Sequence, residues 1–323
     1  MHDMLIRLRR NRRTEAIRSL VQETSLNPSD LIAPLFVIEG SNRTELIESM
    51  PGIERMSVDR ILKKIERICE KGIFSIALFP SIEHAEKSAR GEEAWNPKGL
   101  IPRTIREIKR HFPHLCLIAD VALDPYTTHG HDGLVNESGH VLNDETIECL
   151  IQMAAVQAEA GIDLVAPSDM MDGRIRAIRE HLDRSQFEHV GIIAYSAKYA
   201  SSLYSPFRNA VQVNLQFGDK LSYQLNPANV REALLEAKLD EEEGADILMV
   251  KPALFYLDVI TKLRQQTNRP IAAYHVSGEY SMVMAAGKCG YLNPAKVFYE
   301  SLLSIKRSGA DMIFTYAYDV VTM

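Results

Sequence analysis

Short apolar runs rich in β-branched residues recur along the whole chain. They occupy residues 32–38, 73–79, 115–121, 162–167, 190–196, 246–251, 270–276 and 311–316. The apolar positions in these runs are continuous rather than alternating, which is typical of strands buried on both faces of a sheet. The pattern therefore predicts a parallel sheet built from these segments.

Helical patterns fill most of the intervals between the runs. Residues 57–72 begin with a candidate N-cap, Ser57, and end at Gly72, while residues 143–161 and 226–244 open on Asn and close on Gly. Strands and helices alternating in this number predict an α/β fold, specifically a (β/α)₈ TIM barrel. A doubly wound sheet is the alternative, but no glycine-rich phosphate turn follows any of the runs.

One connection in this pattern is longer than the others. About residues 197–225 separate the fifth predicted strand from its helix. Long connections in a compact domain often serve as active-site lids. We therefore expect this segment, called the lid below, to cover part of the barrel mouth.

The composition of the 323-residue chain limits its partners and its setting. Apolar residues make up 46% and charged residues 25%, and the formal net charge of -6 gives no reason to expect nucleic acid as a partner. No apolar run approaches the ~20 residues of a membrane span, so no membrane is expected. The four cysteines are scattered without a close pair, which favours a reduced, cytoplasmic setting over a disulfide framework.

The amino terminus is basic and lies ahead of the first predicted strand. Residues 7–13 read RLRRNRR, and the amphipathic, polar stretch that follows lacks the apolar core of a signal peptide. A single basic run in an acidic protein is weak support for nucleic-acid binding. We expect an extended arm over residues 1–25, solvated or packed on a partner, and a catalytic barrel over residues 26–323.

Polar side chains lie where six of the predicted strands end. In a (β/α)₈ barrel the active site forms at these carboxyl ends and in the loops that follow them. The predicted strands therefore point a set of polar groups at one mouth: Asp120, Ser168, Lys198, Lys251, Ser277 and Tyr316.

Lys251 is the most informative of these residues. The apolar residues DILMV precede it and PALF follows it, so its amine emerges from an apolar wall. Desolvation lowers the pKa of a lysine, and the ammonium of Lys198 on the adjacent strand would lower it further. An uncharged amine is what a lysine needs to attack a carbonyl and form a Schiff base. The alternative is a lysine that extends to solvent at the barrel rim.

Several long stretches of the chain resemble porphobilinogen synthase, also called δ-aminolevulinic acid dehydratase. The resemblance extends from the basic arm to the last strand, and that family has a (β/α)₈ barrel with an N-terminal arm. The stretches that carry it are APLFVIEG, NPKGLIPR, HGHDG, APSDMMDGRI, YSAKYASSLYSPFR, ADILMVKPA, YHVSGEYSM and SLLSIKRSGAD.

The resemblance implies a reaction and roles for particular residues. Two 5-aminolevulinate molecules would condense to porphobilinogen with loss of water, as in tetrapyrrole (haem) biosynthesis. Lys251 would form a Schiff base with one substrate and Lys198 with the other. One substrate carboxylate would be held by Arg208 and Lys220 from the lid, and the other by Ser277 and Tyr316. Ser205 departs from the family, which usually has Gly at this lid position.

The resemblance also bears on the stretch DVALDPYTTHGHDG, residues 120–133. In zinc-dependent relatives, cysteines occupy the positions of Ala122, Asp124 and Asp132, and alanine with two carboxylates does not suit zinc. We therefore expect no active-site zinc, with Asp120, Asp124 and Asp132 facing substrate amines or water. A monovalent ion or Mg²⁺ at these acids is the alternative. The histidines of this stretch, His129 and His131, are interpreted as groups that order the loop.

The resemblance further implies an allosteric Mg²⁺ and an assembly. Glu236 matches the family's allosteric Mg²⁺ ligand, although the sequence alone would suggest a surface salt bridge. The family forms a homo-octamer in which arms embrace neighbouring barrels, so self-association is expected. Two rival functions remain: another Schiff-base lyase of the class I aldolase type, and a non-catalytic barrel. The paired lysines and the basic lid residues favour an enzyme acting on two acidic substrates.

Overall fold

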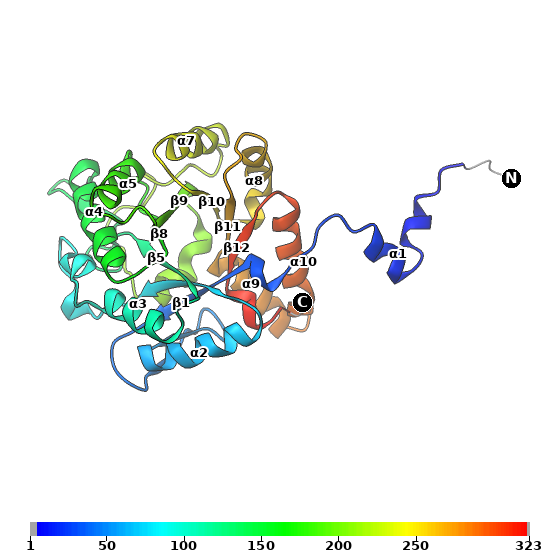
Figure 1. The fold of residues 1–323 in the computed structure, drawn as a ribbon, viewed down its shortest axis with the longest axis horizontal. Coiled ribbons are helices and arrows are strands. Elements are labelled where there is room, and N and C mark those ends of the chain that lie inside the picture. Colours follow the sequence, from blue (N-terminus) through cyan, green and yellow to red (C-terminus); the bar gives the residue numbers. More distant parts are fainter. Residues whose placement is uncertain (1–4, 322–323) are drawn as a thin grey trace.

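The structure is a computed structural model that describes residues 5–321 (Figure 1). The first four residues of the expected arm and the last two of the expected barrel lie outside this range. The described residues form a barrel of alternating strands and helices, from which the amino-terminal segment extends (Figure 1).

A closed parallel sheet forms the centre of the molecule. Eight of the strands within residues 5–321 follow one another in the order β12-β11-β10-β9-β8-β5-β4-β1, and β1 also pairs with β12, with Leu31 opposite Ile313. This closure confirms the predicted (β/α)₈ barrel and shows that the doubly wound alternative is wrong. The strands are β1 (Leu31–Val37), β4 (Ser75–Pro80), β5 (Cys116–Val121), β8 (Leu164–Pro167), β9 (Gly191–Lys198), β10 (Ile247–Lys251), β11 (Ile271–His275) and β12 (Met312–Thr315).

Each barrel strand coincides with one of the apolar runs to within two residues at either end. Every residue of β1 is buried, which explains why the run lacks polar alternation. Short strands outside the barrel form two small additions: β2 (Thr44–Leu46) and β3 (Glu54–Met56) extend the sheet beside β1, and β6 (Leu134–Val135) pairs with β7 (Val141–Leu142).

Helices surround the barrel and cover the outer face of its sheet (Figure 1). In α2, the buried residues Ile61, Ile65 and Ile68 recur at helical spacing, and the chain leaves the helix through Gly72 at a φ of 82°. The helices are α1 (Glu15–Leu20), α2 (Val58–Glu70), α3 (Leu100–His111), α4 (Asn143–Glu159), α5 (Arg174–Arg184), α6 (Ser205–Ala210), α7 (Arg231–Glu242), α8 (Leu257–Arg264), α9 (Ser277–Lys288) and α10 (Pro294–Arg307).

The start of α7 differs from the sequence prediction. The helix begins at Arg231 rather than at Asn226. Leu225 is bound to the end of β9, because its N–H donates to the Lys198 carbonyl at 3.0 Å and its carbonyl accepts from the Ala200 N–H at 2.9 Å. The chain must turn away from this pairing before a helix can begin, and the Asn226 side chain closes the turn by accepting from the Ala228 N–H at 2.9 Å.

The amino-terminal segment stands away from the barrel (Figure 1). Most residues from 5 to 25 are exposed, including the apolar side chains of Leu5, Ile6, Leu8 and Leu20. Its one α-helix, α1, is capped by Thr14, whose hydroxyl accepts from the Ile17 N–H at 3.2 Å. The division into an arm of residues 1–25 and a barrel of residues 26–323 stays a prediction. Within residues 5–321, no helix is both long and apolar enough to cross a lipid bilayer.

Candidate active site

A small cavity lies at the mouth of the barrel, under the lid. The lid contributes a 3-10 helix (Ser202–Tyr204), α6 and the following loop. The free volume of the cavity is about 30 Å³, which is room for about two water molecules. Its walls are formed by Phe79, Asp120, Asp124, Ser168, Lys198, Tyr204, Phe207, Arg208, Lys220, Gln224 and Lys251. The structure thus brings most of the expected site residues together.

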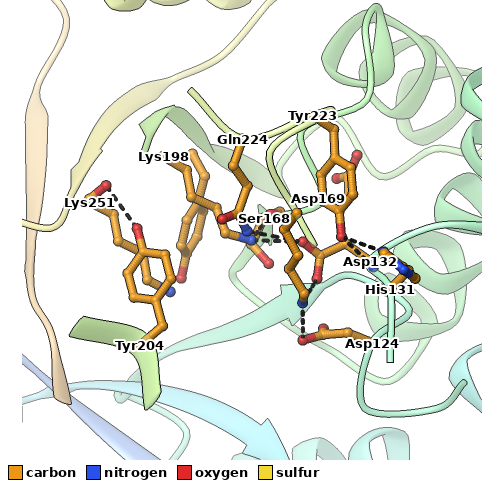
Figure 2. Close-up of polar contacts among 12 residues, drawn as sticks. Asp124, His131, Asp132, Ser168, Asp169, Lys198, Tyr204, Tyr223, Gln224 and Lys251 are labelled. Carbon is orange, nitrogen blue, oxygen red and sulfur yellow. Dashed lines mark hydrogen bonds and ion pairs between the residues drawn. The ribbon is translucent and has the colours of Figure 1, made fainter. Parts of the chain in front are cut away.

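Lys251 reaches this cavity from among aromatic side chains, of which Figure 2 labels Tyr204. Lys251 is the last residue of β10, and it is only 6% exposed. Burial, together with the nearby ammonium of Lys198, lowers the pKa of Lys251 to about 7. A large fraction of the amine is therefore uncharged near neutral pH. The rings around its Nζ have their centroids 4.5 to 5.2 Å away and belong to Tyr274, Tyr195, Phe207 and Tyr204.

Lys198 lies beside Lys251 but in a polar setting. The two lysines are register partners on β9 and β10, so their side chains leave the sheet in the same direction. The Lys198 ammonium donates to the Ser168 carbonyl and to Asp132 Oδ2, the latter at 3.3 Å. The two amines therefore share one cavity in different electrostatic surroundings.

Asp132 connects the barrel with the lid (Figure 2). Its carboxylate is 1% exposed, and it accepts from Lys198 on one oxygen and from Lys220 on the other, at 2.7 Å. Lys220 also pairs with Asp124 at 3.2 Å. Burial would raise the pKa of Asp132, but Lys198 and Lys220 outweigh it and hold this pKa below its usual range. The lid lysine is thus fixed to the barrel by two carboxylates.

Asp120 is the acid that faces the lysines without a strong partner. Burial and the charge of Asp124 raise its pKa to about 7, and the ammonium of Lys251 acts in the opposite direction. Its Oδ1 atom is buried and has no hydrogen-bond partner among the described residues. A carboxyl group with this pKa can accept and return a proton near neutral pH.

The two histidines of the 120–133 stretch make contacts that order the loop. His129 Nε2 lies 3.2 Å from the Ala89 carbonyl. His131 uses both ring nitrogens on the lid, with Nε2 at 3.1 Å from the Phe217 carbonyl and Nδ1 at 3.2 Å from the Tyr223 hydroxyl. Neither histidine lines the cavity, which agrees with the interpretation of both as loop-ordering groups.

Ser277 and Tyr316 are near the site but do not line the cavity. The Ser277 hydroxyl accepts from the Phe207 N–H at 3.0 Å and donates to the Leu203 carbonyl at 3.2 Å, so it binds the lid itself. The Tyr316 hydroxyl lies 2.9 Å from that of Tyr274. In this structure both hydroxyls therefore have partners within the protein.

The sequence analysis did not identify the aromatic residues around Lys251 or the side-chain amide of Gln224. The available signal was the density of aromatics in residues 195–207, where Tyr195, Tyr204 and Phe207 all fall. The Tyr204 hydroxyl also donates to the Lys251 carbonyl at 3.0 Å. Gln224 lines the cavity and donates to Asp132 at 3.4 Å, but its sequence neighbourhood carries no comparable signal.

Glu236 lies outside this cavity, on the inward side of α7. It faces a second cavity of about 460 Å³, which is also lined by Glu232 and Asp172. Its carboxylate accepts from Arg174 at 3.3 Å, so the salt bridge suggested by sequence alone is present, although Arg174 is fully buried. Burial raises the pKa of Glu236 to about 7, with Arg174 opposing the shift.

The fold and the cavity together define a class of protein. A closed parallel barrel with a desolvated lysine amine at its mouth, next to a second lysine held by carboxylates, is typical of Schiff-base-forming (β/α)₈ enzymes. Comparison with known families is more specific. The chain belongs to the delta-aminolevulinic acid dehydratase family, a family of lyases whose model matches residues 5–323. The resemblance noted in the sequence is thereby confirmed.

Similar proteins agree with this assignment. The delta-aminolevulinic acid dehydratase of Chlamydia pneumoniae is 57% identical over 96% of this chain and 93% of that protein. The chloroplastic enzyme of Physcomitrium patens is 53% identical over 97% of this chain and 72% of that protein. The structure of delta-aminolevulinic acid dehydratase (porphobilinogen synthase) from Toxoplasma gondii ME49, in complex with the reaction product porphobilinogen, superposes with a TM-score of 0.96. It is 48% identical and covers 98% of this chain and 90% of that one.

Proposed function

We propose that the chain condenses two molecules of 5-aminolevulinate to porphobilinogen, with loss of water, through Schiff bases on Lys251 and Lys198. The observation that carries the proposal is the pair of lysines on adjacent strands at one buried cavity. A single Schiff-base lysine would suffice for a class I aldolase, whereas two amines at one cavity suit a reaction that joins two carbonyl substrates. The product complex of the Toxoplasma relative supports the same reaction.

The surroundings of the two amines suggest different tasks. Lys251, with its pKa lowered to about 7, is available as the uncharged nucleophile at neutral pH. Asp120 is placed to take up and return protons there, because its own pKa is raised to about 7. Lys198 is held in place by Asp132 and the Ser168 carbonyl, and its Schiff base with the second substrate forms only after the Lys198 amine has given up a proton.

Substrate entry requires the lid to move. A free volume of about 30 Å³ is too small for either substrate. We propose that Lys220 exchanges Asp124 and Asp132 for a substrate carboxylate, which it holds together with Arg208. Ser277 and Tyr316 would bind the other carboxylate after releasing their present partners, Phe207 and Tyr274.

The donor atoms at the cavity do not fit zinc. Ala122 offers no ligand, and Asp124 and Asp132 are already paired with the Lys220 ammonium. Zinc prefers thiolate and imidazole ligands in such sites. We therefore derive no step through zinc and propose that the acids of this stretch act on the lysine ammonium groups and the substrate amines.

The assay for this function is incubation of the purified protein with 5-aminolevulinate and a colour reaction for the pyrrole product. We expect product to form and a strong zinc chelator to leave the initial rate within about twofold, because the site lacks soft ligands. Protein without any product formation would favour the non-catalytic barrel. If the chelator removed bound zinc and the activity fell in parallel, this would contradict the proposal that Asp124 and Asp132 do not bind zinc.

We further propose Glu236 as the ligand of an allosteric Mg²⁺. The cavity beside it, about 460 Å³, is wide enough for a hydrated ion, and Glu232 and Asp172 add negative charge to its wall. Mg²⁺ commonly keeps several waters and takes only one or two carboxylates, so few direct protein ligands are needed. The lid residues Leu221 to Leu225 line the same cavity, which gives the ion a physical route to the lid.

Removing the Glu236 carboxylate is expected to abolish the Mg²⁺ response. Allosteric coupling is typically worth ~1–3 kcal/mol, so Mg²⁺ should stimulate the native rate by roughly fivefold or more, and Glu236→Ala should not respond. Glu242→Ala, on the exposed side of the same helix, is the control. Rate and sedimentation are followed together during the titration. A full response in Glu236→Ala would place the ion elsewhere, with Asp124 and Asp132 as the next candidates.

Self-association and location complete the proposal. The exposed apolar side chains of the arm, among them Leu5 and Leu8, would be covered by a second copy of the chain. We propose a homo-octamer assembled through these arms. The four cysteines are free rather than disulfide-bonded, which supports a reducing, cytoplasmic location.

A further inference from the structure

The first turn of α9 contacts both the lid and the loop that follows Lys251. Ser277 binds the lid through Phe207 and Leu203. Gly278 has no room for a side chain, because a Cβ atom there would lie 2.5 Å from the Leu203 carbonyl oxygen. The third residue of the turn, Glu279, faces the other way, toward the loop after β10. These three residues thus join two parts of the site that are far apart in sequence.

Glu279 has a fully buried carboxyl group that accepts from backbone donors. Its Oε2 accepts from the Val276 N–H and its Oε1 from the Leu254 N–H, each at 2.6 Å. No lysine or arginine pairs with it among the described residues. Burial raises the pKa of Glu279 to about 8, although the backbone N–H groups favour the ionised form. Both oxygens are thus used by the backbone, one within α9 and the other on the loop after β10.

The contact with Leu254 fixes the chain just beyond Lys251. The Lys251 carbonyl is itself held from the lid side, by the Tyr199 N–H at 2.9 Å and the Tyr204 hydroxyl at 3.0 Å. Glu279 therefore holds the backbone that follows Lys251, and the lid residues hold the carbonyl of Lys251 itself. A glutamate that only caps its own helix would bond the N-cap N–H and leave its second oxygen to solvent.

We propose that Glu279 is a positioning residue for Lys251: by holding the Leu254 N–H, it sets the direction from which the lysine amine enters the cavity. This inference rests on the proposed role of Lys251 as the Schiff-base lysine. Small displacements of a reacting group, on the order of 1 Å, reduce rates by about 100-fold. A loosened loop after β10 should therefore slow imine formation more than it weakens substrate binding.

The test is Glu279→Gln, which keeps the size of the side chain but has one acceptor oxygen in place of two. One of the two N–H groups then faces an NH₂ group, so the link between α9 and the β10 loop is broken or strained. The control is Asn293→Ala, which removes the N-cap of α10, where the Asn293 side chain accepts from the Lys296 N–H at 3.2 Å on an exposed surface. Both variants lose a contact at the start of a helix, but only the contact of Glu279 involves the loop that follows Lys251.

We measure kcat, KM, melting temperature and the rate at which borohydride traps the substrate imine on Lys251. We expect Glu279→Gln to lower kcat and the trapping rate by about 10- to 100-fold with KM changed by less than about threefold. Asn293→Ala should lower the melting temperature without changing either rate. Trapping at the native rate in Glu279→Gln would overturn the positioning role, as would a rate loss that Asn293→Ala reproduces at equal melting temperature. Native protein that forms no imine on Lys251 would instead overturn the proposed function, and the inference with it.

Discussion

Lys251→Ala is expected to lower turnover by roughly 10⁴-fold or more while leaving the barrel folded, as removal of a covalent nucleophile generally does. The remaining lysine of the pair, Lys198, is bound to Asp132 and the Ser168 carbonyl and is assigned to the other substrate, so it does not replace Lys251. The substitution removes a buried amine from among four aromatic rings but keeps the carbonyl of residue 251, which accepts from the Tyr199 N–H and the Tyr204 hydroxyl. The fold should therefore survive the change.

The effect is measured with the pyrrole assay and by circular dichroism on the same preparations. Lys238→Ala is the control, since that side chain is exposed on α7 and forms a surface ion pair with Glu242. Borohydride with substrate should modify native protein at Lys251, and peptide mapping identifies the modified residue. Activity near the native level in Lys251→Ala, or reduction of substrate onto a residue other than Lys251 and Lys198, would contradict the assignment.

The pH dependence of the trapping reaction follows from the same surroundings. Because burial and Lys198 lower the pKa of Lys251 to about 7, the uncharged amine increases as pH rises through 7 and then reaches a plateau. The trapping rate should therefore rise between about pH 6 and pH 8. An ordinary exposed lysine would still be gaining reactivity near pH 10. A rate that keeps rising to pH 10 would show that the amine is not desolvated.

The barrel could be predicted from sequence because its strands are buried on both faces. Each strand then reads as a continuous apolar run, and the polar residue at its end marks the mouth. The apolar flanks of Lys251 predicted its desolvation for the same reason. The start of α7 could not be predicted, since it depends on the pairing of Leu225 with Lys198 and Ala200, which is a tertiary contact.

Contacts between site residues that are far apart in the chain could not be predicted from the sequence either. Asp132 and Lys220 are far apart in the chain, and nothing local to either residue indicates that they form a buried ion pair. Glu279 reads as an ordinary glutamate in a helix start, and only the fold shows that it is buried. The resemblance supplied roles for Ser277 and Tyr316, but the Ser277 hydroxyl is engaged by the lid and the Tyr316 hydroxyl by Tyr274 of β11.

Asp132→Asn should cause the second large loss, because one carboxylate holds both an active-site lysine and the lid. The asparagine cannot neutralise the ammonium groups of Lys198 and Lys220, and only Asp124 would remain to pair with Lys220. Leaving a buried charge without its partner typically costs about 3–5 kcal/mol. The protein can relieve much of this cost by releasing Lys220, and the lid with it, into solvent.

We therefore expect Asp132→Asn to lower kcat by roughly 100-fold or more, from misplacement of Lys198, and to expose residues 211–219 of the lid to proteolysis. The control is Asp219→Asn, an exposed carboxylate of the same lid that accepts from the Leu221 N–H. Limited digestion and the pyrrole assay, run on both variants and on native protein, separate the two effects. A lid that stays protected in Asp132→Asn would mean that the His131 contacts with Phe217 and Tyr223 are enough to close it. Native turnover in that variant would show that neither lysine depends on the Asp132 charge, and the ion pairs would then be part of the resting lid rather than of the reaction.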